Sequence, residues 1–295
     1  MSIGASGELA DVSGLQDLAS GDARRRLNRY LVIGMTIVGL IVFTALVSFI
    51  WTPYDPTEVD AEARLLEPST SHVLGADKFG RDVLSQLMWG ARTTLFVGVV
   101  AVGVAALIGT PLGILAGMFP RWADELVMRS NDLLLAFPAL LLAIMFGAVF
   151  GASTLTAMLA IGIATVPAFA RIARSGTLQV MSREYVLAAR AAGRPRFAIA
   201  RRHVLPNIAP LLIVQSSVAF GIAVLAEAAL SFLGFGTRPP NPSWGRMLQE
   251  SQELLHSAPL LSVWPGLAIA LAVLGFNLLG DGLRDHFDPR LDDRR

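Results

Sequence analysis

Six stretches of the chain are apolar over the length that a membrane-spanning helix needs, and polar segments separate them. About 20 consecutive apolar residues cross the roughly 30 Å hydrocarbon core of a bilayer as an α-helix. Only two or three residues separate the third stretch from the fourth, which predicts a tight antiparallel pair. The predicted spans cover residues 30–51, 93–118, 131–151, 154–172, 207–234 and 259–283.

This pattern predicts an all-α integral membrane protein with six transmembrane helices. We expect the first helix to be uncleaved, because a signal peptide would have a shorter apolar core and a small-residue cleavage site. Polar composition predicts a flexible N-terminal tail. The predicted parts are the tail 1–29, the first helix 30–51, a segment 52–92 outside the membrane, a five-helix core 93–283 that contains polar segments 183–206 and 235–258, and a C-terminal tail 284–295.

The composition excludes a soluble protein. Hydrophobic residues make up 54% of the chain and charged residues 16%, and the mean hydropathy is +0.57. An average soluble domain has about 25% charged residues. The net charge of +1 and the lack of a separate basic domain argue against nucleic acid as a partner. The absence of cysteine excludes disulfides, thiolate catalysis and cysteine-ligated metals.

The basic residues also exclude a nucleotide site of the usual kind. Lys78 is the single lysine, and no glycine-rich loop precedes it, whereas a P-loop needs a lysine beside the phosphates. The four histidines are far apart in sequence, so no zincin-type pair is present. We therefore expect no catalytic residue, no metal and no cofactor bound by this chain.

The distribution of charge predicts which side of the membrane each segment faces. Placing both tails, 119–130 and 171–206 in the cytoplasm gives that side 18 of the 24 basic residues. Cytoplasmic segments carry an excess of lysine and arginine. We therefore expect both termini to be cytoplasmic. The basic residues left on the outer side are Arg64, Lys78, Arg81, Arg92, Arg238 and Arg246.

Several residues inside the spans are unusual for a plain apolar helix. Glu227 is the one acid clearly within a span, where a carboxylate costs about 2–3 kcal/mol unless it meets a cavity or a partner. A lining or structural role competes there with proton coupling. Glycines four residues apart in the second span predict close approach of another helix. Prolines interrupt the spans at Pro111, Pro138, Pro167, Pro210 and Pro265.

The arginine-rich segment 183–206 predicts a short helix, a bend and a second short helix. Gly193 can end the first helix in a left-handed conformation. Pro195 stands where proline starts a helix favourably, and Pro206 with Asn207 is expected to end the second helix and start the next span. The alternative from the residues alone is a basic loop that contacts lipid headgroups.

The spacing of this segment resembles the EAA loop of binding-protein-dependent ABC importer permeases. That loop reads Glu-Ala-Ala, three residues, Gly, nine residues, Ile, one residue, Leu-Pro. Here Leu187 replaces the glutamate and His203 replaces the isoleucine. The residues that the resemblance assigns to coupling with an ATPase are Leu187, Ala188, Ala189, Gly193, Phe197, His203, Leu205 and Pro206.

Three further blocks, in the same order as in that family, extend the similarity to about residues 30–290. They resemble the dipeptide, oligopeptide and nickel branch, and within it the second, "C"-type, permease subunit. The blocks comprise 72–95, 229–248 and 264–290. The resemblance implies a type I ABC importer (MetI-like) permease core with an extra N-terminal helix and outer segment.

The resemblance also implies partners in a bacterial-type inner membrane. They would be a second permease subunit, two cytoplasmic ATPase subunits that hold ATP and magnesium, and an extracytoplasmic substrate-binding protein over 52–92 and 235–258. This chain would convert ATPase motion into alternating access to a shared pore. Its candidate pathway or gate residues are Pro138, Glu227 and Asn277.

Other functions remain open at this point. Within the family, the cargo of the importer could be dipeptides, longer peptides, glutathione or nickel chelates. A proton-coupled secondary transporter or a channel would be expected to have several buried acids or a clear repeat of broken helices. A membrane enzyme would need a cluster of histidine and acidic residues, which the sequence does not show.

Overall fold

The computed structural model describes residues 29–119 and 121–287, and most of these residues are helical. Within these ranges, the isolated antiparallel bridge between Ala76 and Asp82 is the one β-interaction. The predicted all-α class is therefore confirmed. The helices are a first helix Arg29–Ile50, α2 Val83–Met118, α3 Trp122–Leu135, α4 Ala139–Phe150, α5 Thr154–Met181, α6 Glu184–Ala191, α7 Arg196–Ile199, the π-helix η1 Ala200–Val204, α8 Leu205–Phe232, α9 Trp244–Ser251, the 3-10 helix η2 Gln252–Leu254 and α10 Leu260–Phe287.

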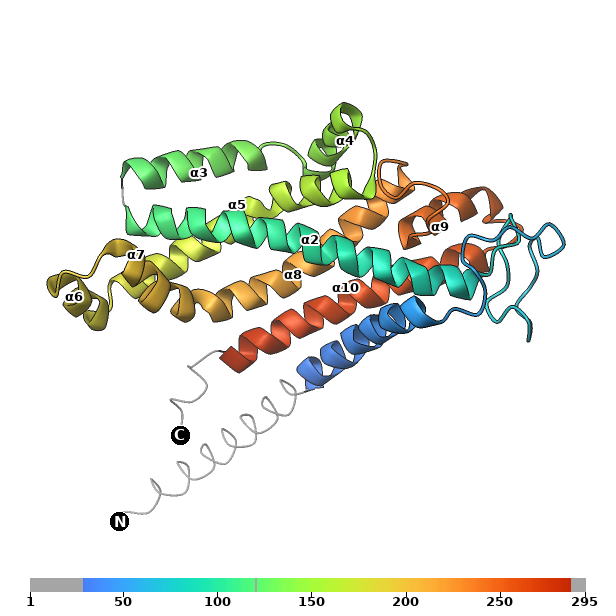
Figure 1. The fold of residues 1–295 in the computed structure, drawn as a ribbon, viewed down its shortest axis with the longest axis horizontal. Helices are drawn as coiled ribbons and strands as arrows, with labels where there is room; N and C mark the ends of the chain where they lie inside the picture. The colour runs from blue at the N-terminus through green and yellow to red at the C-terminus, as the bar shows by residue number, and fades with distance from the viewer. Residues whose placement is uncertain (1–28, 120, 288–295) are drawn as a thin grey trace, which may run out of the picture.

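The long helices α2, α5, α8 and α10 run side by side along the longest axis of the molecule (Figure 1). The first helix, drawn in blue, lies along α10, while α3 and α4 lie on the opposite face against α5. α6 and α7 occupy one end of the bundle, and α9 occupies the other end together with residues 51–82. Among the described residues, five helices are long and apolar enough to cross a membrane, and α3 with α4 makes a sixth span if the bent pair counts as one.

The contact between α2 and α5 depends on glycines. Gly109, Gly113 and Gly117 face α5, and a Cβ atom built on Gly113 would lie only 2.3 Å from the carbonyl oxygen of Ala170. Such a distance leaves no room for a side chain. A small residue at every fourth position lets two helix backbones approach closely in a membrane. The close approach predicted for this glycine face is therefore confirmed, with α5 as its partner.

The third predicted span differs from the structure. In place of one helix over 131–151, α3 and α4 meet at a bend of 82°. Proline has no amide hydrogen and disfavours helical geometry in the residue before it. Pro138 has φ −56° and ψ 129°, which is not helical, and it starts α4 as the N-cap residue. The break therefore falls at this proline.

Ion pairs to α5 stabilise the direction of α3, which the bend separates from the direction of α4. Asp124 forms a two-point contact with Arg174, in which the Nη2–Oδ2 distance is 2.6 Å. Nearer the bend, Arg171 Nη2 lies 2.6 Å from Asp132 Oδ1. Each pair joins residues that are far apart in the sequence, so the predicted apolar stretch gave no sign of this anchoring.

Three of the other helices, α2, α5 and α10, extend beyond the predicted apolar spans. α2 begins at Val83, ten residues before the predicted start at 93, because Asp82 Oδ2 accepts a hydrogen bond from the Ser85 amide at 2.8 Å and caps the helix. The last ten residues of the predicted outer segment 52–92 therefore belong to α2. α5 continues to Met181 instead of 172, and α10 continues to Phe287 instead of 283. A helix that leaves the membrane keeps its backbone bonds, and hydropathy does not mark where it ends.

The predicted tails lie mostly outside the described residues. Of the segment 1–29, only Arg29 is described, and it already belongs to the first helix. Of the segment 284–295, the residues up to Phe287 are the last turn of α10, which corrects the predicted start of this tail.

The glycine contact can be tested with a matched pair of substitutions in α2. Gly113→Ala places a methyl group against the α5 backbone, and we expect overpacking to destabilise the purified chain by about 1–3 kcal/mol. Gly103→Ala is the control, because a Cβ there meets nothing within 4 Å. Thermal unfolding in detergent measures both. Equal stability of the two variants would contradict the glycine-dependent packing of α2 on α5.

Candidate functional site: a surface element and two polar clusters

The chain between α5 and α8 forms a short surface element at one end of the bundle (Figure 1). α6 ends at a glycine turn, in which the amide of Arg194 bonds to the carbonyl of Ala189 at 3.1 Å and the amide of Gly193 bonds to that of Arg190 at 3.0 Å. These two bonds define a Schellman motif. Gly193 has φ +75°, so the predicted left-handed conformation is confirmed.

Three apolar side chains fasten this element to the bundle. Val186 of α6, Ile199 of α7 and Val204 of the π-helix are each at most 1% exposed. They pack in one cluster with Val180 and Ile208 from the adjoining long helices. The sequence prediction missed these anchors, because the motif that identified the element emphasises its small residues and its turn.

The residues predicted for coupling lie mainly on the outer surface of this element. Phe197 is 78% exposed, Leu187 49% and Leu205 41%, although all three are apolar. Beside them runs an open groove. It is lined by Arg194, Phe197, Ala198, Arg201, Arg202 and Pro206. The remaining predicted residues are exposed Ala188, Gly193 and Pro206, and half-buried Ala189 and His203.

The second short helix does not end at Pro206 as predicted. The helical path instead continues without interruption from Arg196 to Phe232, a length of 37 residues. A π-turn over Ala200–Val204 precedes the proline, and the amide of Leu205 bonds to the carbonyl of Ala200. Proline is tolerated in the first turn of a helix because its missing amide hydrogen is not needed there. The second half of the surface element, α7 with the π-helix η1, thus forms one continuous helical rod with the membrane span α8.

At the opposite end, an ion-pair cluster ties residues 77–81 to α9. Arg81 Nη2 lies 2.6 Å from Asp77 Oδ2 and also contacts Glu250. Arg246 contributes a second cation to Glu250, with 2.7 Å between Nε and Oε1. Desolvation lowers the pKa of the buried Arg81 guanidinium, but the attraction of Asp77 and Glu250 outweighs it and raises that pKa above its ordinary value. Arg81 is therefore a permanent charge that needs both carboxylates.

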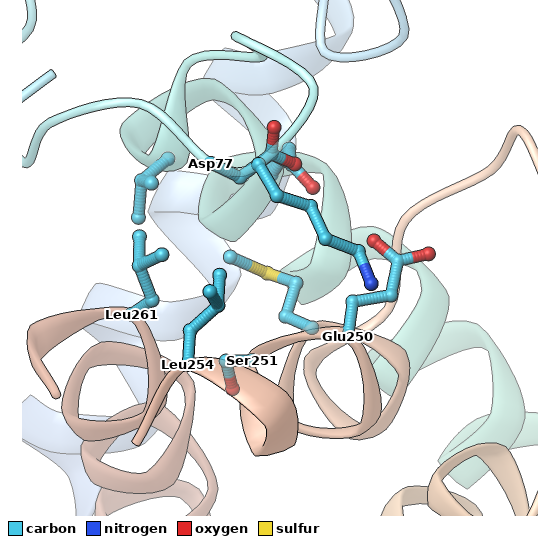
Figure 2. Close-up of a pocket in the computed structure, with 9 residues that line it drawn as sticks. Asp77, Glu250, Ser251, Leu254 and Leu261 are labelled. Atoms are coloured by element: carbon cyan, nitrogen blue, oxygen red, sulfur yellow. The ribbon is translucent and has the colours of Figure 1, made fainter. Parts of the chain in front are cut away.

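The ion-pair cluster borders a small cavity. Figure 2 shows Asp77 on one side of this cavity, with Glu250, Ser251 and Leu254 on the other. The cavity volume is about 20 Å³, which is room for about one water molecule. It is too small for a peptide or a sugar. In residues 29–119 and 121–287, no group of three or more histidine, cysteine or acidic side chains is placed to hold a metal ion.

Glu227 lies in α8 and is 1% exposed. Its Oε1 accepts a hydrogen bond from Ser231 Oγ at 2.7 Å and a longer one from Thr237 Oγ1 at 3.5 Å. The Thr237 amide in turn donates to Ser231 Oγ at 3.0 Å. The carboxylate thus ties the loop that follows α8 back onto the end of that helix.

The other two predicted pathway residues lie elsewhere. Pro138 is exposed at the break between α3 and α4, and Asn277 is exposed on α10, near Gly221 of α8. No hydrogen bond or ion pair in the described residues joins any two of the three predicted pathway residues. Their proposed common role remains a prediction.

The ion-pair cluster predicts that substituting two neighbouring glutamates, Glu250 and Glu253, destabilises the protein to different degrees. Glu250→Ala removes a carboxylate from buried Arg81, and we expect a loss of about 2–3 kcal/mol in the free energy of unfolding. Glu253→Ala is the control, because this side chain is 82% exposed and lies 3.5 Å from Lys78, so the cost should be about 0.5 kcal/mol. Thermal unfolding and proteolysis within 52–82 measure the effect. A larger loss from Glu253→Ala would refute this ranking.

Comparisons with known proteins place the chain in a family. Residues 109–293 match the profile of the binding-protein-dependent transport system inner membrane component. The dipeptide transport system permease protein DppC of Alkalihalophilus pseudofirmus is 42% identical over 264 residues, covering 90% of this chain and 87% of the relative. The glutathione transport system permease protein GsiD of Pectobacterium atrosepticum is 41% identical, covering 91% and 90%.

A third relative and a solved structure agree with this result. The di/tripeptide transport system permease protein DppC of Pseudomonas aeruginosa is 41% identical, covering 90% of this chain and 89% of the relative. A chain of the MetNI methionine ABC transporter, solved in inward-facing conformations, has a TM-score of 0.57 at 18% identity and covers 69% of this chain and 97% of its own length. That likeness shows the fold. The chain therefore belongs to the family of inner membrane components of binding-protein-dependent transport systems, as the sequence motifs predicted.

Proposed function

We propose that this chain is a permease subunit of an ATP-driven importer for di- or oligopeptides. The observation that carries the proposal is the identity of 41–42%, over about 90% of the chain, with permeases named for dipeptides, di/tripeptides and glutathione. All three cargo names denote short peptides, since glutathione is a tripeptide. Import of glutathione or of a nickel chelate by the same family is the alternative.

The surface element between α5 and α8 is proposed to bind an ATPase subunit. Its exposed apolar side chains, Phe197 and Leu187, would cost free energy in water and favour burial against a protein partner. The neighbouring arginines of the groove offer donors for acidic side chains of that partner. ATP and magnesium would be held by the partner, and this chain would bind no cofactor. A second permease subunit would complete the pore.

The charge distribution supports an orientation with both termini and the surface element in the cytoplasm. This arrangement assigns 18 of the 24 basic residues to the cytoplasmic side. The ion-pair cluster and α9 would then face the extracytoplasmic space. That surface, built from residues 51–82 and α9, is proposed as the docking surface for a substrate-binding protein.

Proton-coupled secondary transport is the candidate function from another class. Such a carrier needs a carboxyl group that exchanges protons with water on both sides. Glu227 is instead buried and bonded to two hydroxyl groups that hold a loop. We therefore propose a structural role for its carboxylate.

Substitutions of Glu227 distinguish an ATP-driven importer from a proton-coupled transporter. Glu227→Gln keeps an oxygen that accepts the Ser231 hydrogen bond, so uptake of a labelled dipeptide should stay within about twofold of the wild type. Glu227→Leu leaves both hydroxyl groups without an acceptor and should lower stability by about 1–3 kcal/mol. Cells lacking other peptide importers provide the assay. Abolished uptake in a well-expressed Glu227→Gln variant would favour proton coupling.

The coupling role is tested at Gly193. A Cβ atom there meets nothing within 4 Å, so the only local penalty is the backbone strain of positive φ, about 1–2 kcal/mol. Gly193→Glu adds a charged side chain to the proposed docking surface. We expect normal abundance in the membrane and at least about tenfold slower peptide uptake, which corresponds to about 1.4 kcal/mol.

Gly193→Asn is the matched control, because asparagine tolerates the left-handed conformation and adds no charge. It should retain most of the uptake and of the substrate-stimulated ATP hydrolysis. If Gly193→Glu is well expressed and transports at the normal rate, this element does not couple the permease to an ATPase.

A further inference from the structure

Arg92 of α2 occupies an aromatic cage at the contact with the first helix. Its guanidinium carbon lies 4.2 Å from the ring centroid of Phe49 and 4.3 Å from that of Trp89. Its Nε donates a hydrogen bond to Ser48 Oγ at 2.5 Å. Rings on both helices and one hydroxyl therefore fix the position of the cation.

The charge of Arg92 has no counter-ion within residues 29–119 and 121–287. Arg81 and Arg246, at the same end of the bundle, both pair with Glu250, whereas no carboxylate of the described residues lies within ion-pair distance of Arg92. A guanidinium has five donor hydrogens, and within the described part of the chain only the one on Nε is used. The planar edge that carries the other four is available to an anion.

The depth of Arg92 corresponds to the edge of the membrane. It contacts Ser48 and Phe49, which belong to the last turn of the 22-residue first helix. The apolar part of α2 begins directly after Arg92 and runs for the remaining 26 residues of that helix. At about 1.5 Å per residue, 26 residues extend about 39 Å, enough to cross the hydrocarbon core.

An exposed apolar stripe continues from Arg92 toward the membrane centre. Phe96 and Val99 follow at four and seven residues, on the same face of α2, and are 60% and 62% exposed. On the first helix, Phe49 and Leu46 are 68% and 59% exposed. A cation at the membrane edge thus stands above apolar surface on both helices.

We propose that Arg92 binds the phosphate of a phospholipid headgroup whose acyl chains lie along this apolar stripe. Arginine donates two parallel hydrogen bonds to phosphate oxygens, and the aromatic rings would keep its plane turned toward the headgroup. A bound lipid would contact both helices and strengthen the attachment of the first helix to α2. The inference is independent of the cargo and of the orientation proposed above.

The free charge of Arg92, its depth and the apolar stripe together favour a phospholipid over other anions. A soluble phosphate would gain nothing from the exposed apolar side chains. A carboxylate of another subunit would account for the free charge, but not for the apolar stripe directly below the cation at membrane depth. A phospholipid matches the charge, the depth and the apolar surface together.

Lipid-dependent thermal unfolding of the purified full-length chain in detergent tests the site. The probes are dioleoylphosphatidylglycerol and dioleoylphosphatidylethanolamine, with dioleoylglycerol lacking the phosphate and glycerol phosphate lacking the acyl chains. We expect stabilisation by the two phospholipids only. Arg92→Gln should weaken the apparent phospholipid affinity about tenfold, and Arg92→Lys less.

Arg238→Gln is the charge-matched control, since Arg238 is exposed at the same end of the bundle and lies outside the cage. It should bind phospholipid like the wild type. If Arg92→Gln folds poorly, Trp89→Leu, which removes one wall of the cage, should still weaken phospholipid binding severalfold. Native mass spectrometry of the same samples should count fewer bound phospholipids in the Arg92 and Trp89 variants.

Three results would overturn the proposal. Equal stabilisation by dioleoylglycerol would show an apolar groove without a phosphate site. Protection by glycerol phosphate alone would show a soluble anion site. Unchanged phospholipid affinity in Arg92→Gln, with loss of binding to a second permease subunit, would assign the charge to a protein partner.

Discussion

The requirement that every backbone amide inside a membrane finds a partner within the chain governs this structure. It applies to the membrane part of α8, which belongs to a helical path that runs unbroken from Arg196 to Phe232 for 37 residues, or about 55 Å, although Pro206 and Pro210 lie within it. A π-turn accommodates the first proline at the surface. The result is one rod that begins in the surface element and ends at the Glu227 cluster on the far side of the bundle.

This rod gives the proposed coupling a mechanical basis. The buried side chains Val186, Ile199 and Val204 attach the surface element to the bundle, while Phe197 stays free on its outer face. A force that an ATPase subunit applied to this face would act on the N-terminal end of the continuous helix. At its other end, the hydrogen bonds of Glu227 hold the loop that leads to α9. Motion at one end is therefore expected to reach the proposed docking surface for the binding protein.

The sequence was most informative where local chemistry decides the structure. Apolar length located the spans, and the turn at Gly193 followed from its position after a small-residue helix. The family assignment followed from motif spacing. Five prolines were candidates for a broken span, and only Pro138 lies at a helix break in the described residues. The ion pairs that hold α3 apart from the line of α4 join residues 39 and 50 positions apart, which local patterns do not record.

Long-range contacts also explain why the sequence did not predict the ion-pair cluster at the end of the bundle that carries α9. Arg81 and Glu250 are 169 positions apart, and nothing near either residue marks the other as its partner. The hydroxyl partners of Glu227 lie closer in sequence, but serine and threonine are too common to identify them. The extra turns of α2 depend on the cap by Asp82, which looked like part of a polar loop.

The most direct test of the coupling account is cysteine cross-linking in the assembled importer. The native chain has no cysteine, so every thiol cross-link to this chain reports an introduced position. Phe197→Cys and Leu107→Cys replace apolar side chains that are both 78% exposed, one on the surface element and one in the apolar part of α2. The account predicts that Phe197→Cys cross-links to a cytoplasmic ATPase subunit and that Leu107→Cys does not. An active importer in which Phe197→Cys never reaches an ATPase subunit would contradict it.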